Sequence, residues 1–195
     1  HYLGRFDPKE ITTEGDDASL DGIAIVIDGD LITTEEDANE LFKTHKTNLS
    51  VDIILTQVKS GEQFRKEEIN NFKVGLEDYL SLDPKLPNGK LNIESIKILK
   101  VILNNLKKVR NRRPNAHVYY CNSGTYKDER EIKASFEIIN RYVRETDLFY
   151  KVSVTPLGRS EILKLYADLT QKNEAKLKLI DYFGMPKMPG IPQSY

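Results

Sequence analysis

The chain has 195 residues, of which 39% are hydrophobic and 30% are charged, and its formal net charge at pH 7 is −1. These values fit one sizeable globular domain and exclude both a disordered chain and a globally basic one, so nucleic acid could be bound only through a local patch. We find no run that predicts a transmembrane helix or a signal peptide, and the single cysteine, Cys121, favours a reducing cytoplasm.

The first predicted elements are two short strands, a helix and a longer strand. "IAIVID" (Ile23–Asp28), followed across an Asp-Gly-Asp turn by "GDLIT" (Gly29–Thr33), predicts a hairpin. The next segment predicts a helix capped by Thr33 or Thr34, with acidic residues in its first turn. The run Ser50–Ser60 is apolar on both faces in its middle, which predicts a central strand of a sheet covered on both sides.

Helices and strands are expected to alternate through the rest of the chain. The predicted elements are a helix in "KEEINNFKVGLEDYL", a long helix capped by Asn92 and stopped by Pro114, a strand and turn at Ala116–Gly124, a helix in "DEREIKASFEIINRYVRET", a strand in "FYKVSVTPLG" and a helix capped by Ser160. This order favours an α/β fold in which parallel strands follow an opening hairpin.

Polar side chains that suit a metal site lie at the start of one predicted strand and at the end of another. Gln57 and Lys59 are two residues apart, so they share one face of the strand. Asp21 precedes the hairpin. A hard cation, Mg²⁺ or Mn²⁺, takes oxygen ligands, which Asp21, Gln57 and the backbone carbonyl of Val58 could supply. Lys59 could then offset charge on a reacting phosphate, although a strand that leaves the core also turns polar.

The order of these residues resembles that of a known group of nucleases. "GDDASLDGIAIVIDG" followed by "VDIILTQVKSG" resembles the PD-(D/E)xK nuclease superfamily in its Gln-x-Lys variety, which is found in Mrr-type restriction endonucleases. "LDGIAIVIDGDLITTEEDANEL", "VDIILTQVKSGEQFRKEEINNF", "HVYYCNSGTY" and "VTPLGRSEILKLY" together resemble the amino-terminal part of the AIPR family of bacterial abortive-infection phage-resistance proteins. The resemblance implies a restriction-endonuclease-like mixed sheet flanked by helices, with Asp21, Gln57 and Lys59 as catalytic residues.

The sequence departs from the pattern of that superfamily in its acidic residues. Gln57 replaces an acid, and related nucleases often add a glutamate from a helix ahead of the first strand, for which the chain before Asp21 has no room. Either a nearby acid takes the place of that glutamate or the helix lies outside this chain, and weak activity is expected. The nearby acids are Glu10, Glu14, Asp16 and Asp17. Because Asp21 should repel Asp16 and Asp17, its removal is expected to raise the melting temperature slightly when no metal is bound.

Basic residues could contact nucleic acid at two places. One is Lys66, near the start of a predicted helix, and the other is a run that contains Lys108, Arg110, Arg112 and Arg113. The run is placed at the predicted end of the long helix, where cations also complement the helix dipole, so both interpretations stay open.

The leading hypothesis is a metal-dependent nuclease domain over residues 1–184, acting in bacterial defence against phage. Residues 185–195 are rich in proline and glycine and are expected to begin a linker or a following segment. The expected partner is nucleic acid, DNA rather than RNA, with no membrane partner, and a homo-oligomer could form through a region outside this chain. The alternatives are a catalytically decayed nucleic-acid-binding module and a protein-interaction module of a larger defence protein.

Overall fold

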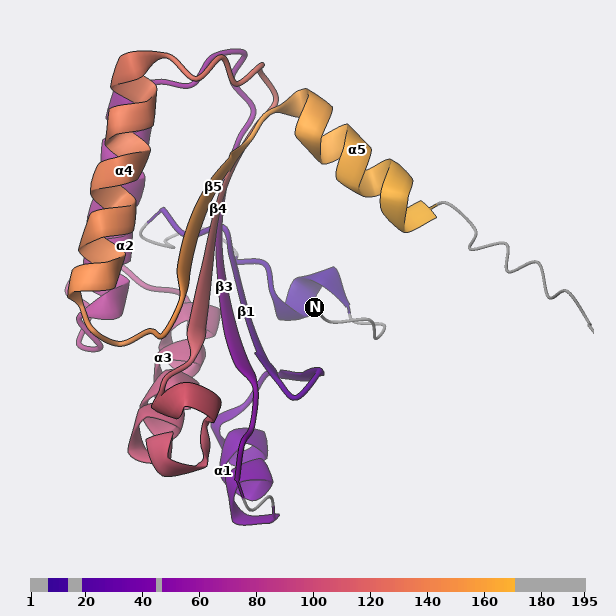
Figure 1. The fold of residues 1–195 in the computed structure, drawn as a ribbon, viewed down its shortest axis with the longest axis vertical. Helices are drawn as coiled ribbons and strands as arrows, with labels where there is room; N and C mark the ends of the chain where they lie inside the picture. Colours follow the sequence, from indigo (N-terminus) through magenta and orange to yellow (C-terminus); the bar gives the residue numbers. More distant parts are fainter. Residues whose placement is uncertain (1–6, 14–18, 45–46, 171–195) are drawn as a thin grey trace, which may run out of the picture.

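The computed structural model describes residues 7–13, 19–44 and 47–170. Its centre is a five-stranded mixed sheet with the strand order β2–β1–β3–β4–β5 (Figure 1). Strand β1 pairs antiparallel with β2 and with β3, whereas β3, β4 and β5 are parallel. The strands are β1 (Gly22–Ile27), β2 (Asp30–Ile32), β3 (Val51–Lys59), β4 (Asn115–Asn122) and β5 (Val152–Leu157). The predicted α/β class, the mixed sheet and the opening hairpin are confirmed, and the sheet is compatible with a restriction-endonuclease-like fold.

Helices flank this sheet, and most of them pack on one face. The helices are α1 (Glu35–Thr44), α2 (Lys66–Leu80), α3 (Lys90–Asn104), α4 (Arg130–Glu145) and α5 (Arg159–Thr170), with short 3₁₀ turns η1 (Pro8–Glu10), η2 (Leu106–Lys108) and η3 (Arg110–Arg112). Helices α2 and α4 stand side by side over one face of the sheet, α3 packs against β1 and α1, and α5 points away from the sheet (Figure 1). Among the described residues, no helix combines the length and the apolar character that a membrane span requires.

The core lies between the sheet and the helices. Alternate residues of β3 point into it, and Ile53, Leu55 and Gln57 are fully buried. On the other face of β3, within the part of the chain that the structure describes, Ile54 is half-buried and Val58 is 55% exposed. The expectation that β3 is covered on both sides is therefore wrong for the described residues, whereas its central position in the sheet is confirmed.

The predicted bounds of α3 are wrong at both ends. The helix begins at Lys90 after Gly89, so Asn92 lies inside it and donates its side-chain N–H to Asn88 Oδ1 at 2.8 Å. It ends at Asn104, well before Pro114, because the backbone that follows forms hydrogen bonds with Leu49 instead of continuing the helix. Leu49, just before β3, donates its N–H to the carbonyl of Lys108 at 2.9 Å and accepts the N–H of Arg110 at 2.8 Å. The basic run therefore lies in and just after the 3₁₀ turns η2 and η3 rather than at the end of an α-helix.

The remaining cap predictions have mixed outcomes. Thr34 accepts the N–H of Asp37 at 3.1 Å, as a residue that caps α1 should. Ser160, in contrast, lies within the first turn of α5, and it is Glu161 that accepts the N–H of Gly158, at 3.0 Å. The segment 185–195, expected to start a linker, lies outside the described residues.

Candidate functional site

Asp21 lies directly across from Gln57 at the end of the β1–β3 pair. The antiparallel register pairs Gly22 of β1 with Thr56 of β3. Asp21, just before Gly22, therefore faces Gln57, just after Thr56. The backbone N–H of Asp21 donates to the carbonyl of Thr56 at 2.9 Å, which fixes this position. Because β1 and β3 are antiparallel, the beginning of β1 lies at the carboxyl end of β3, the end at which open α/β sheets bind ligands.

The Asp21 carboxylate, the Gln57 amide and the backbone of Val58 form one hydrogen-bonded group. Asp21 Oδ2 accepts the backbone N–H of Val58 at 2.6 Å and also a side-chain N–H of Gln57. Gln57 Nε2 lies 3.3 Å from the carbonyl oxygen of Val58, to which it also donates. All the oxygen atoms that the sequence proposes as metal ligands are therefore contributed within one short stretch of sheet.

The other end of the Gln57 amide is buried without a hydrogen bond. The side chain is 0% exposed, and its Oε1 atom accepts no hydrogen bond from the described part of the chain. A buried polar atom that lacks a partner costs about 1–3 kcal/mol, so native proteins rarely leave one without a reason. A bound cation or an ordered water would supply the missing partner.

Lys59 lies on the same face of β3 as Gln57, but within the described ranges no ion pair joins its ammonium to Asp21. Its side chain is half-buried, and its backbone carbonyl accepts the N–H of Ser123 at 3.1 Å, which ties the end of β3 to the loop after β4. Among the described residues no acid pairs with this ammonium. The structure therefore brings Asp21 and Gln57 together, and Lys59 lies two residues further along the same face of β3.

Sequence reasoning missed Tyr120 and Glu68. Tyr120 is the partner of Gln57 in the β3–β4 register, and its buried hydroxyl donates to Glu68 Oε2 at 3.4 Å. Burial raises the pKa of the Tyr120 phenol well above its usual range, and the charges of Glu68 and Asp21 raise it further. Both carboxylates thus act on the same phenol. The signals in sequence were an acid in the first turn of α2 and a tyrosine on the buried face of β4, neither of which is specific.

A cavity of about 300 Å³ lies between the loops that follow β3 and β4. Its lining residues are Glu62, Gln63, Phe64, Thr125, Tyr126, Lys127, Glu129 and Ile132. Two carboxylates and one ammonium do not favour a phosphate group, so we assign this cavity no part in phosphate binding.

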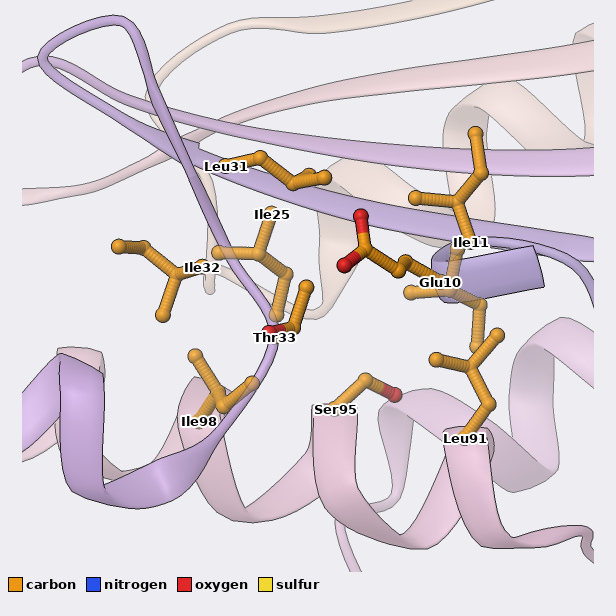
Figure 2. A pocket seen from close by; sticks show the side chains of 10 residues that line it. Glu10, Ile11, Ile25, Leu31, Ile32, Thr33, Leu91, Ser95 and Ile98 are labelled. Carbon is orange, nitrogen blue, oxygen red and sulfur yellow. The ribbon is translucent and has the colours of Figure 1, made fainter. Parts of the chain in front are cut away.

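Glu10, one of the acids expected to complete the site, points elsewhere. Its carboxylate accepts the N–H of Asp7 at 3.2 Å and points towards Leu31 in a small crevice between the β1–β2 hairpin and α3 (Figure 2). The crevice encloses about 10 Å³, about the space of a single water. The other expected acids, Glu14, Asp16 and Asp17, lie outside the described residues.

The basic run lies at the opposite end of the sheet from Asp21 and Gln57. It precedes β4, whereas Gln57 pairs with a residue near the end of β4. Three of its cations have partners in the fold: Lys108 donates to the carbonyl of Phe42, Arg110 Nε to Asn48 Oδ1 at 3.3 Å, and Arg113 to both carboxylate oxygens of Asp147 at 2.5 and 2.6 Å. Arg112 is exposed. Lys66, in contrast, is exposed at the start of α2, which follows the carboxyl end of β3.

The donor set of the candidate site is poor in acids. Within the ranges that the structure describes, no three His, Cys, Asp or Glu side chains gather in a group that could hold a metal ion. Any metal bound here would rely on amide and backbone oxygen atoms beside the carboxylates. No protein-family model, no curated protein and no solved structure matches this chain.

Proposed function

We propose that this chain is a metal-dependent nuclease domain that hydrolyses phosphodiester bonds of nucleic acid in bacterial defence against phage. The observation that carries the proposal is the contact of Asp21 with Gln57 and Val58 at the carboxyl end of β3, with Lys59 on the same face of the strand. The defence role and the preference for DNA rest on the resemblance to AIPR proteins alone.

The residues present fit a hard divalent cation. A carboxylate, a primary amide and a backbone carbonyl are oxygen donors of the kind that Mg²⁺ and Mn²⁺ take, and Gln57 Oε1 is buried without a partner among the described residues. A primary amide can present either its N–H groups or its oxygen, so Gln57 can donate to Asp21 or join it as a ligand. When bound, the ion would polarise the scissile phosphate and lower the pKa of a water molecule.

The chain's own residues would then hold the ion and stabilise charge. Asp21 contributes the negative charge of the site, and Val58 fixes the orientation of that carboxylate through its N–H. Lys59 would stabilise charge that develops on the phosphate, since within the described ranges no acid pairs with its ammonium. Lys66 would contact the nucleic-acid backbone at the same end of the sheet.

Lys59→Ala tests this proposal most directly. Excess protein is incubated with end-labelled DNA or RNA and Mg²⁺ or Mn²⁺, so that even slow single-turnover cleavage is detected. Loss of a cation aimed at developing charge should slow cleavage by a hundredfold or more, equivalent to roughly 3 kcal/mol. The stability should change by no more than about 0.5 kcal/mol, because no buried partner is lost. Lys43→Ala, at an exposed position on α1 at the far end of the sheet, is the matched control.

A decayed nucleic-acid-binding module is the second candidate. The amide of Gln57 donates to Asp21, and this contact satisfies the carboxylate without any metal. Such a module would bind nucleic acid through Lys66 but would neither bind Mn²⁺ nor cleave. Equal and metal-independent cleavage by the parent chain and Lys59→Ala would indicate a contaminating nuclease and contradict the leading proposal.

A further inference from the structure

The candidate site needs a second negative charge. One carboxylate and two neutral oxygen atoms bind a divalent cation weakly, because both the affinity and the neutralisation of the ion depend on the number of charged ligands. We propose that Glu68 of α2 is this second carboxylate and binds the same cation as Asp21 and Gln57. The inference rests on the proposed function and supplies the acid that the segment before Asp21 was expected to contribute.

Glu68 reaches the site by way of Tyr120. The ring of Tyr120 points towards α2, where its centroid lies 5.7 Å from that of Phe72, and its hydroxyl donates to Glu68 Oε2 at 3.4 Å. Tyr120 is the register partner of Gln57, and neighbouring strands are about 4.8 Å apart, so the residue that contacts Glu68 stands directly beside Gln57 in the sheet. Glu68 therefore lies over the same face of the sheet and at the same end as Gln57.

Neither a helix cap nor an ion pair explains why Glu68 turns towards Tyr120. It is the third residue of α2, where a glutamate commonly reaches back to cap the backbone, yet α2 has no side-chain capping bond. Its carboxylate is half-buried, and no basic residue of the described ranges pairs with it. Glu67, in the same turn, is exposed to solvent. Within the described ranges the carboxylate accepts one hydrogen bond, from the Tyr120 phenol, so it keeps lone pairs with which it could bind an ion.

An independent observation points to a cation at this place. Gln57 Oε1 is fully buried and accepts no hydrogen bond from a described residue. Gln57 is the register partner of Tyr120 and Glu68 accepts the Tyr120 hydroxyl, so both neighbours of this tyrosine carry oxygen acceptors that a cation could use. A cation with its coordinated waters, ligated by Gln57 once its amide presents the oxygen toward Asp21, would satisfy both.

The experiment measures Mn²⁺ binding by calorimetry, in the absence of nucleic acid, for the parent chain and three variants. Glu68→Gln keeps the shape of the side chain and an acceptor for Tyr120 but removes the charge. Glu67→Gln removes a charge from the same helical turn, so it controls for the helix dipole and for net charge. Asp21→Asn reports on the proposed site itself. Thermal unfolding in EDTA verifies that each variant folds.

We expect Glu68→Gln to weaken Mn²⁺ binding about tenfold or more and Glu67→Gln to leave it within about twofold of the parent. In EDTA, Glu68→Gln should melt at or above the temperature of the parent chain, because a half-buried charge is removed. Binding that is lost in Asp21→Asn but unchanged in Glu68→Gln would overturn this inference and leave the proposed function standing. Absence of Mn²⁺ binding by the parent chain would overturn both.

Discussion

Gln57 donates its side-chain N–H to the carboxylate of Asp21 across the end of the β1–β3 pair, and the same carboxylate oxygen accepts the N–H of Val58 at 2.6 Å. Beyond the last backbone pairing of these strands, the Val58 N–H is thus satisfied by a side chain, the Asp21 carboxylate. The contact therefore has a structural role in the absence of metal, which alters what the removal of Asp21 should do.

Asp21→Ala should destabilise the metal-free chain. The sequence suggested the opposite, because repulsion from Asp16 and Asp17 would be relieved, but the substitution also leaves the Val58 N–H and the buried Gln57 amide without their acceptor. Leaving such groups unpaired costs about 1–3 kcal/mol, whereas a solvent-screened charge pair typically contributes less than about 1 kcal/mol. Urea unfolding in EDTA measures the effect, with Asp21→Asn as a control that keeps one acceptor oxygen. A more stable Asp21→Ala variant would show that repulsion dominates.

Gln57→Glu should make the fold depend on a divalent cation. The substitution places a second carboxylate against Asp21 at a position that is 0% exposed, so the melting temperature in EDTA should fall below that of the parent chain. Saturating Mn²⁺ should raise the melting temperature of the variant more than that of the parent, because the ion relieves the repulsion. Gln57→Leu, which removes one ligand of the ion, should respond less than the parent chain. Equal responses of all three proteins would contradict a cation at Gln57.

Strand periodicity was sufficient to place Gln57 and Lys59 on one face of a central strand. It could not establish that Asp21 lies opposite Gln57, because the register of β1 on β3 depends on the packing of both strands against the helices. The contact of Glu68 with Tyr120 joins residues 52 positions apart and depends on how α2 lies across β4, so no local pattern indicates it.

The errors at the ends of α3 have the same origin. The apolar spacing continues to Leu106, but the helix ends at Asn104 because Leu49 forms backbone hydrogen bonds with Lys108 and Arg110. Asn111 and Arg112 then take positive φ angles of 57° and 61°, which a continuing right-handed α-helix does not allow. Local helix propensity is weak compared with such tertiary contacts.

Stability should fall at alkaline pH because of Tyr79. Its hydroxyl is buried and donates to Ser95 Oγ at 3.0 Å, and burial raises the pKa of the phenol from 10.0 to about 12. Below pH 10 both states hold the proton, but between about pH 10 and 12 the unfolded chain releases it while the folded chain keeps it. The free energy of unfolding should then decrease by up to about 1.4 kcal/mol per pH unit from this group.

Tyr79→Phe isolates that contribution. At about pH 9 the variant should be less stable than the parent by about 1 kcal/mol, owing to the lost hydrogen bond. By about pH 11 the difference should shrink or reverse, because only the parent chain carries the ionisation penalty of Tyr79. Urea unfolding of both proteins at several pH values provides the measurement. Parallel pH profiles would show that the Tyr79 phenol titrates normally.

Arg113→Ala should affect stability rather than nucleic-acid binding. Arg113 forms two hydrogen bonds with the carboxylate of Asp147 in a partly exposed pair, so its loss should cost about 0.5–1 kcal/mol. Because it lies at the end of the sheet away from Gln57, labelled DNA should bind the variant as tightly as the parent chain.

Lys66→Ala, at the end where Gln57 lies, should weaken binding and reduce the salt dependence by about one phosphate contact. Fluorescence anisotropy of labelled DNA at several salt concentrations compares the two variants with the parent chain. If the salt dependence is reduced in Arg113→Ala alone, the nucleic-acid surface lies at the basic run, far from the proposed catalytic residues.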